Sequence, residues 1–223
     1  MRRITILAVA AVAVATAVFA VLASAEDGKD NAAVADSPSS YLRDSGPGLP
    51  AATFRSRPPG RRARLIEAVA NARLATARYA TDLERAKADG YRIITPMIPD
   101  MGFHYMNPAI KEFDVRRPMI LVYERRGDEY QLGALEWVFP KKPSKPPLPG
   151  AKYGTFAAAC HYQDGMFVPE RSEQRCQKTN AETGSPFSFW HPQLVTLHFW
   201  VWYPNPDGLF AGINPFVRPF NEG

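Results

Sequence analysis

The stretch that decides the fold is "PMILVYERRGDEYQLGALEWVF", residues 118–139. Two runs rich in β-branched, aromatic and other large apolar residues flank "RRGD", residues 125–128. Gly127 can adopt the positive φ that a tight reversal needs. The pattern therefore predicts a β-hairpin with strands over 118–124 and 129–139.

Upstream of this hairpin, residues 60–90 repeat small and apolar side chains at helical spacing. Ala, Leu, Arg and Glu favour a helix, and Gly90 suits its C-terminal cap. We expect one long helix that packs closely on the sheet through a narrow, Ala-rich stripe. The residues that define the stripe are Leu65, Ile66, Val69, Ala72, Thr76, Tyr79, Ala80, Leu83 and Ala86.

Further strands are expected on both sides of the hairpin. The candidates are residues 91–95, 102–106, part of 151–159, and 194–203. The last of these, within "LVTLHFWVWYPNP" (194–206), is apolar on both faces, which predicts a covered strand. The Pro- and Gly-rich tail (205–220) is expected to wrap the domain and bury Phe210, Ile213 and Phe216. The fold class predicted is α+β, with one long N-terminal helix packed on an antiparallel β-sheet or a partly closed β-barrel.

The N-terminus has the features of an export signal. A basic Met1-Arg2-Arg3 precedes an apolar run over residues 4–22, which ends in Ala-Ser-Ala at 23–25. This predicts a signal peptide (1–25), a disordered linker (26–59) and a single globular domain (60–223) in a secreted or extracytoplasmic protein. The alternative is that residues 4–22 remain as an uncleaved membrane anchor.

The charge balance limits the partners. Without residues 1–25 the chain has 25 basic and 22 acidic side chains, too small an excess for a nucleic-acid-binding protein. We expect a monomer that binds a small molecule or a metal ion and makes weak contact with an anionic envelope surface through arginines at the start of the helix. Those arginines are Arg55, Arg57, Arg61, Arg62 and Arg64.

Two cysteines, Cys160 and Cys176, predict one disulfide in an exported chain. The bond would close the polar segment "CHYQDGMFVPERSEQRC", for which we expect no regular structure. His161 in this segment and His191 further on are expected in solvated loops.

Three side chains suited to metal binding fall in apolar strands: His104 in "MGFHYM", Glu136 in "GALEWVF" and His198 in "TLHFW". Two histidines and a carboxylate form a common site for a divalent transition metal such as Zn, Cu or Fe. The thioethers of Met97, Met101 and Met106 would favour copper if they point inward. Two alternatives stay open: the buried groups satisfy one another structurally, or an imidazole–carboxylate pair acts as acid and base in a ligand pocket.

Three segments together resemble an exported bacterial family of unknown function. They are "MGFHYMNP" (101–108), "PMILVYERRGDEYQLGALEWVFP" (118–140) and "LHFWVWYPNPDGLFAGINP" (197–215). Their order and spacing are similar over roughly residues 62–218, although the segment between the two cysteines departs from the pattern. The resemblance implies that His104, Glu136 and His198 occupy the family's motif positions. It implies no activity.

These features predict a small-ligand or metal-binding module with a buried His/Glu site. One alternative is a metal-dependent enzyme that uses the same site, although nothing assigns a catalytic residue. The chain contains no nucleophile-elbow, zincin, P-loop or dinucleotide-binding motif. The other alternative is a structural or interaction module of the cell envelope without a catalytic site.

Overall fold

A computed structural model describes residues 59–221. The predicted signal peptide and almost all of the predicted linker lie outside this range. Within it, no helix is both long enough and apolar enough to cross a membrane.

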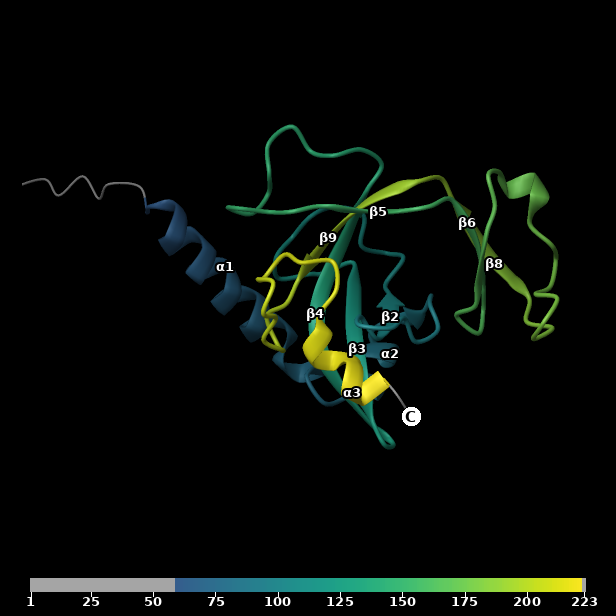
Figure 1. Cartoon of the computed structure of the whole chain (residues 1–223), viewed down its shortest axis with the longest axis horizontal. Helices are drawn as coiled ribbons and strands as arrows, with labels where there is room; N and C mark the ends of the chain where they lie inside the picture. The colour runs from purple at the N-terminus through teal and green to yellow at the C-terminus, as the bar shows by residue number, and fades with distance from the viewer. Residues whose placement is uncertain (1–58, 222–223) are drawn as a thin grey trace, which may run out of the picture. The chain divides into compact units, whose positions relative to one another are not determined.

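The predicted hairpin forms, although its first strand covers residues 120–126 rather than 118–124, so Arg125 and Arg126 belong to the strand and not to the turn. It is part of a six-stranded sheet in which every neighbouring pair is antiparallel (Figure 1). In spatial order its strands are β1 (Arg92–Ile93), β2 (Phe103–Met106), β3 (Ile120–Arg126), β4 (Glu129–Phe139), β9 (Leu194–Phe199) and β5 (Gly154–Phe156). The edge strands β1 and β5 do not pair with each other, so the described residues form an open sheet. The expectation of a partly closed barrel is therefore wrong.

Strand β9 ends at Phe199, earlier than the predicted residue 203, next to a bulge at Gly133 of β4. The pairing of β3 with β4 shifts between Val122 and Tyr123, which leaves Gly133 without a partner in the ladder. Its carbonyl oxygen instead accepts hydrogen bonds from the backbone N–H groups of Trp202 and Tyr203. Trp200 packs so closely over Gly133 that a Cβ there would lie 3.3 Å from the indole ring. The chain after Phe199 is therefore held by loop contacts rather than by strand pairing.

The single long helix predicted over 60–90 is broken into α1 (Arg61–Thr76), the 3-10 turn η2 (Ala77–Tyr79) and α2 (Leu83–Ala88). The carbonyl of Tyr79 accepts a hydrogen bond from the Tyr123 hydroxyl, and that of Ala80 accepts one from the N–H of Leu132. These bonds to the sheet replace bonds within a helix. Asp82 then caps the N-terminus of α2 by accepting from the N–H of Arg85.

Helix α1 buries Ala72 and Thr76 of the expected stripe, and also Ala68, whereas Ile66 of that stripe is 60% exposed. Two of its hydrogen bonds reach the segment after β9, and a third joins Asn71 to Arg116 in the loop before β3. Arg73 Nε donates to the carbonyl of Val201 (2.7 Å), and Trp202 Nε1 donates to Thr76 Oγ1 (2.9 Å).

A second sheet was not expected from the sequence. Its spatial order is β7 (Phe167–Pro169), β6 (Ala159–Tyr162) and β8 (Phe187–His191). Two short links join it to the main sheet: only residues 157–158 separate β5 from β6, and only residues 192–193 separate β8 from β9 (Figure 1). The Cys160–Cys176 disulfide forms as predicted, with a Cα–Cα distance of 5.6 Å. The segment it closes holds β6, β7 and the turn η3 (Glu173–Arg175), so the expectation of no regular structure there is wrong.

The tail is only partly buried. Phe210 packs in the core as expected, but Ile213 and Phe216 are 48% and 53% exposed. The turn η4 (Pro215–Val217), which leads into α3 (Arg218–Asn221), places Val217 in the core instead. Asn214 caps this turn by accepting from the N–H of Phe216, and this fixes which side chains point inward.

Candidate metal centre

The strand register brings the three predicted ligands to one face of the main sheet. Glu136 on β4 pairs directly with His198 on β9. On the other side Glu136 pairs with Ile120 of β3, which in turn pairs with Met106 of β2. His104 lies two residues before Met106 and points to the same face, because side chains alternate along a strand.

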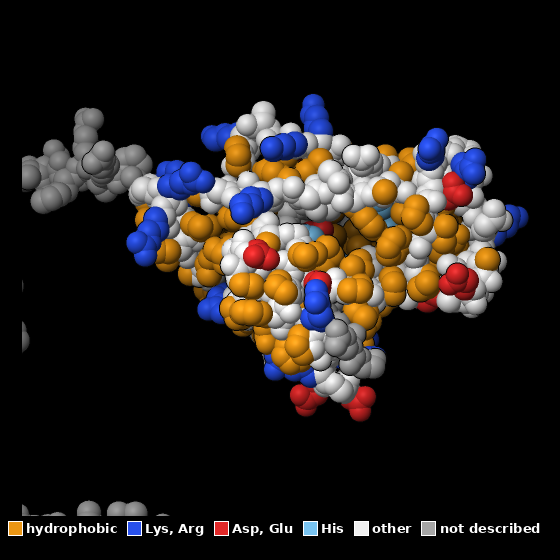
Figure 2. Space-filling model, viewed as in Figure 1, with side chains coloured by type: hydrophobic (Ala, Val, Ile, Leu, Met, Phe, Trp, Pro, Cys, Tyr) orange, Lys and Arg blue, Asp and Glu red, His pale blue; other side chains and the backbone are white. Residues whose placement is uncertain are grey.

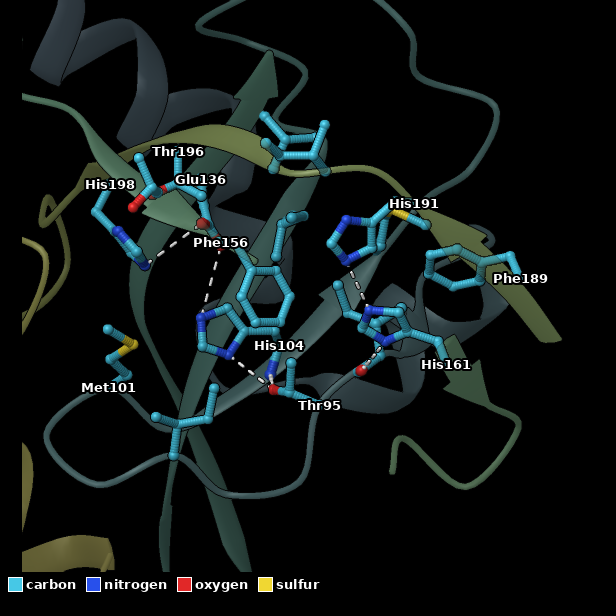
Figure 3. Close-up of a pocket in the computed structure, with 17 residues that line it drawn as sticks. Thr95, Met101, His104, Glu136, Phe156, His161, Phe189, His191, Thr196 and His198 are labelled. Atoms are coloured by element: carbon cyan, nitrogen blue, oxygen red, sulfur yellow. Dashed lines mark hydrogen bonds and ion pairs between the residues drawn. The ribbon is translucent and has the colours of Figure 1, made fainter. Parts of the chain in front are cut away.

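Each carboxylate oxygen of Glu136 faces a different imidazole (Figure 3). Oε2 lies 3.6 Å from His104 Nε2, and Oε1 lies 3.6 Å from His198 Nε2. These distances are too long for hydrogen bonds. His198 Nε2 makes no hydrogen bond with any described residue, although it is buried. The three groups thus converge without satisfying one another.

The same spacing suits three ligands of one ion. Donor atoms from His104, Glu136 and His198 all lie within 4.8 Å of one another. Two metal–ligand bonds of about 2.1 Å that meet at about 120° separate their donor atoms by about 3.6 Å. The buried group can therefore bind a metal ion, and the three residues converge, which the sequence alone left open.

Burial controls the charge of these groups. Burial, together with repulsion from a charge on His198, lowers the pKa of His104 to about 3. Burial raises the pKa of Glu136, which the positive form of His198 partly offsets. At neutral pH the His104 imidazole is therefore neutral, as a metal ligand must be.

Thr95 orients the ring of His104, and Gly102 lets its strand lie against β3. Its Nδ1 lies 2.9 Å from Thr95 Oγ1, which also accepts the backbone N–H of His104 at 3.2 Å. A contact of this kind fixes the ring so that Nε2 points at Glu136. Gly102, just before β2, has φ +108°, and a Cβ on it would collide with the carbonyl of Tyr123. A glycine is thus needed at that position for β2 to lie against β3.

The site opens into a cavity of about 200 Å³, which all four histidines of the chain line. Figure 2 shows a hollow on this face with histidine atoms visible inside it. Most of the other lining residues are apolar: they include Ile98, Met101, Met106, Ile120, Val138 and Leu194. Two of the three methionines expected near His104 are thus found there. Met97 does not line the cavity.

His161 and His191 occupy another part of the same cavity, so their placement in solvated loops is wrong (Figure 3). They belong to β6 and β8, are 1% and 9% exposed, and bring their Nε2 atoms within 3.0 Å of each other. Burial lowers the pKa of His161 to about 4 and also lowers that of His191. The alternation of aromatic residues in "FSFWH" (187–191) was the sequence signal that could have revealed β8.

A further buried acid lies outside this cavity. Glu124 on β3 is fully buried, and neither carboxylate oxygen has a hydrogen-bond partner among the described residues. It fills the space above the Cα of Gly133, where a Cβ would lie 2.5 Å from Oε1. Burial raises the pKa of Glu124 to about 7. Unlike Glu136, it faces no pair of imidazoles.

Comparison with known proteins gives no match: no family model, no curated protein and no solved structure corresponds to this chain.

Proposed function

We propose that this protein is a metal-binding module whose ion is bound by His104, Glu136 and His198, with the adjoining cavity open to a small ligand. The observation that carries the proposal is the position of the Glu136 carboxylate. Both of its oxygens lie 3.6 Å from a buried imidazole nitrogen, beyond hydrogen-bonding range and within the spacing of donors to one ion.

A purely structural role fits these contacts less well. Buried polar groups are nearly always hydrogen-bonded, and leaving one unsatisfied costs roughly 1–3 kcal/mol. The Glu136 carboxylate reaches neither imidazole at hydrogen-bonding distance, and His198 Nε2 has no partner among the described residues. An ion would satisfy all three groups at once and would stabilise the ionised form of Glu136.

The donor set narrows the choice of ion. Two imidazoles and a carboxylate are found in both zinc and non-haem iron sites. A Ca²⁺ or Mg²⁺ ion is disfavoured, because these ions take oxygen ligands. Zn²⁺ is the practical probe because it has no redox chemistry.

The test is isothermal titration of Zn²⁺ into the purified full chain after treatment with a chelator, together with Glu136→Gln. Glutamine retains the shape of the side chain and removes its charge. The wild type should bind Zn²⁺ and gain thermal stability, and Glu136→Gln should weaken binding at this site by at least about 100-fold. Glu124→Gln is the matched control, since it removes a buried carboxylate of the same sheet outside the cavity. Equal Zn²⁺ affinity and stoichiometry in the wild type and Glu136→Gln would refute the proposal.

The cavity supports a second candidate function, a metal-dependent enzyme. Catalytic zinc sites commonly have three protein ligands and leave a position for water or substrate. Co²⁺ in place of Zn²⁺ reports such a position through its visible spectrum. If azide shifts the spectrum of the Co²⁺ protein, an exchangeable position exists. An unchanged spectrum would exclude the enzyme and leave the binding module.

Three expectations from the sequence stay predictions. They are the resemblance to an exported family, the contact of the arginines with an envelope surface, and the monomeric state. Arg61, Arg62 and Arg64 are exposed on α1, as that contact requires, whereas Arg55 and Arg57 lie outside the described residues. The disulfide fits an oxidising compartment.

A further inference from the structure

The pairing of His161 with His191 raises a question of protonation. Their Nε2 atoms are 3.0 Å apart. His161 Nδ1 lies 2.7 Å from the carbonyl oxygen of Ile94, and His191 Nδ1 lies 2.6 Å from that of Pro192. A carbonyl oxygen only accepts hydrogen bonds, so each Nδ1 must carry a proton and donate it.

This requirement fixes both tautomers. A neutral imidazole protonated at Nδ1 has a bare lone pair at Nε2. Two lone pairs therefore face each other across 3.0 Å in a buried place, and this contact is repulsive unless a cation lies between or beside them. The candidates are a proton shared by the two rings and a metal ion bound by both.

The surroundings disfavour the shared proton. Burial lowers the pKa of both rings, because an imidazolium loses its hydration there. The one carboxylate among the described residues that line the cavity is Glu136, and it faces the other two imidazoles. A neutral bis-imidazole pair is a good ligand for a transition metal, which forms bonds rather than relying on solvation.

We propose that His161 and His191 form a second metal site, in which both Nε2 atoms bind a Cu²⁺ ion whose remaining positions face the cavity. Two bonds of about 2.1 Å that meet at about 90° place their nitrogens about 3.0 Å apart. That angle belongs to the square-planar and tetragonal geometry of Cu²⁺, whereas tetrahedral Zn²⁺ would need a separation of about 3.4 Å. Cu²⁺ is also the divalent ion that imidazole sites bind most tightly. The inference does not require that the first site be occupied.

The second sheet holds this pair rigidly. In the register of β6, His161 pairs with Phe167 of β7 on one side and with Phe189 of β8 on the other. Its ring stacks on that of Phe189 with centroids 4.5 Å apart and an interplanar angle of 3°. Phe156 packs against His191 at 5.1 Å. Cys160, next to His161, is tied to Cys176. A pre-organised pair loses little entropy when it binds an ion.

The experiment is a Cu²⁺ titration of four chelator-treated full chains, followed by calorimetry and by electron paramagnetic resonance. The proteins are the wild type, Glu136→Gln, His191→Phe and the double variant. Phenylalanine suits the aromatic surroundings of His191, and circular dichroism checks that each protein is folded. The expected stoichiometries are two Cu²⁺ for the wild type, one for each single variant and none for the double variant. The single ion in Glu136→Gln should show hyperfine coupling to two imidazole nitrogens.

The outcomes separate this inference from the proposed function. If His191→Phe binds as many ions as the wild type, the second site is refuted. If Glu136→Gln binds as many as the wild type, the first site is refuted while the second stands. Should His191→Phe fail to fold, ring ¹⁵N spectra of Glu136→Gln, in which the first site is removed, decide. Cu²⁺ should broaden the signals of His161 and His191 beyond detection, and signals that persist unchanged would overturn the second site.

Discussion

The two histidine clusters of this protein differ in the groups that their imidazole nitrogens face. In the main sheet, His104 and His198 face the two oxygens of one carboxylate at 3.6 Å. In the second sheet, His161 and His191 face only each other, at 3.0 Å, and both Nδ1 atoms are fixed by carbonyl oxygens. The first cluster supplies an anionic ligand and the second none. Because both clusters are buried, this comparison indicates that the groups facing an imidazole, more than its burial, determine which ion it can bind.

One short segment connects the two clusters. Ile94 and Thr95 are consecutive residues that follow β1. The carbonyl of Ile94 accepts from His161 Nδ1, and the hydroxyl of Thr95 contacts His104 Nδ1. The two clusters therefore have no ligand in common, but the same short segment positions one histidine of each.

The largest expected effect comes from a matched pair of substitutions, His104→Ala and His161→Ala. Each removes one donor nitrogen, so each should weaken binding at its own site by about 1000-fold, or about 4 kcal/mol. Affinity at the other site should change by less than about threefold. Calorimetric titration with Zn²⁺ and Cu²⁺ measures both. A loss at both sites from either substitution would show that the clusters form one site.

Removal of the disulfide should act on the second sheet alone. Cys160→Ala with Cys176→Ala opens a loop with a sequence separation of 16, for which chain entropy predicts a loss of about 3 kcal/mol of stability. Cu²⁺ binding at His161 and His191 should weaken, because Cys160 adjoins His161. Zn²⁺ binding at His104, Glu136 and His198 should not. Urea unfolding and metal titration of the same protein check this, and equal weakening at both sites would break the comparison.

The pH dependence of the free energy of unfolding should report on Glu124, the buried acid outside the cavity. The folded-state pKa of Glu124, about 7, lies above its ordinary value of 4.5. The stability from its neutral form is thus complete below pH 4.5 and is lost as the pH rises toward 7. Between pH 4.5 and pH 6 this loss amounts to about 1.6 kcal/mol, because the slope approaches 1.36 kcal/mol per pH unit only between the two pKa values.

Glu124→Gln should remove that loss and leave metal affinity unchanged. Urea unfolding of the wild type and of Glu124→Gln from pH 4.5 to pH 8 gives the difference, from which contributions of the other buried groups cancel. Parallel stability curves would show that Glu124 is not held neutral by burial.

The smallest effect is expected from Thr95→Val, which preserves the shape of the side chain and removes the hydroxyl that orients His104. Zn²⁺ affinity at the first site should fall about tenfold, as for other residues that orient a ligand. Affinity at His161 and His191 should stay the same, because their Nδ1 atoms contact the carbonyls of Ile94 and Pro192 and not the side chain of Thr95. A change at the second site would mean that the substitution moves the whole segment.

The sequence predicts those features that depend on residues close together in the chain better than those that depend on distant residues. The hairpin at residues 118–139 could be read directly, since alternation and the turn residues are adjacent in the chain. The convergence of His104, Glu136 and His198 could be anticipated because isolated polar residues in apolar strands need partners. The break after Thr76 could not, because it depends on hydrogen bonds from Tyr123 and Leu132, distant in sequence.

The second sheet escaped prediction for a related reason. Its strands are three to five residues long, and polar turns separate β6 from β7 within the segment that the disulfide closes. Strands this short are defined by their pairing across the sheet rather than by their own residues. His161 and His191 lie 30 positions apart, so nothing local indicates that they meet.

The central claim is that His104, Glu136 and His198 bind one ion. The most direct test is anomalous diffraction from a crystal of the protein grown with Zn²⁺, recorded on both sides of the zinc absorption edge. We expect an anomalous peak about 2.1 Å from the Nε2 atoms of both histidines and from the Glu136 carboxylate. A well-ordered site with no peak there, and with water between Glu136 and the two imidazoles, would contradict it.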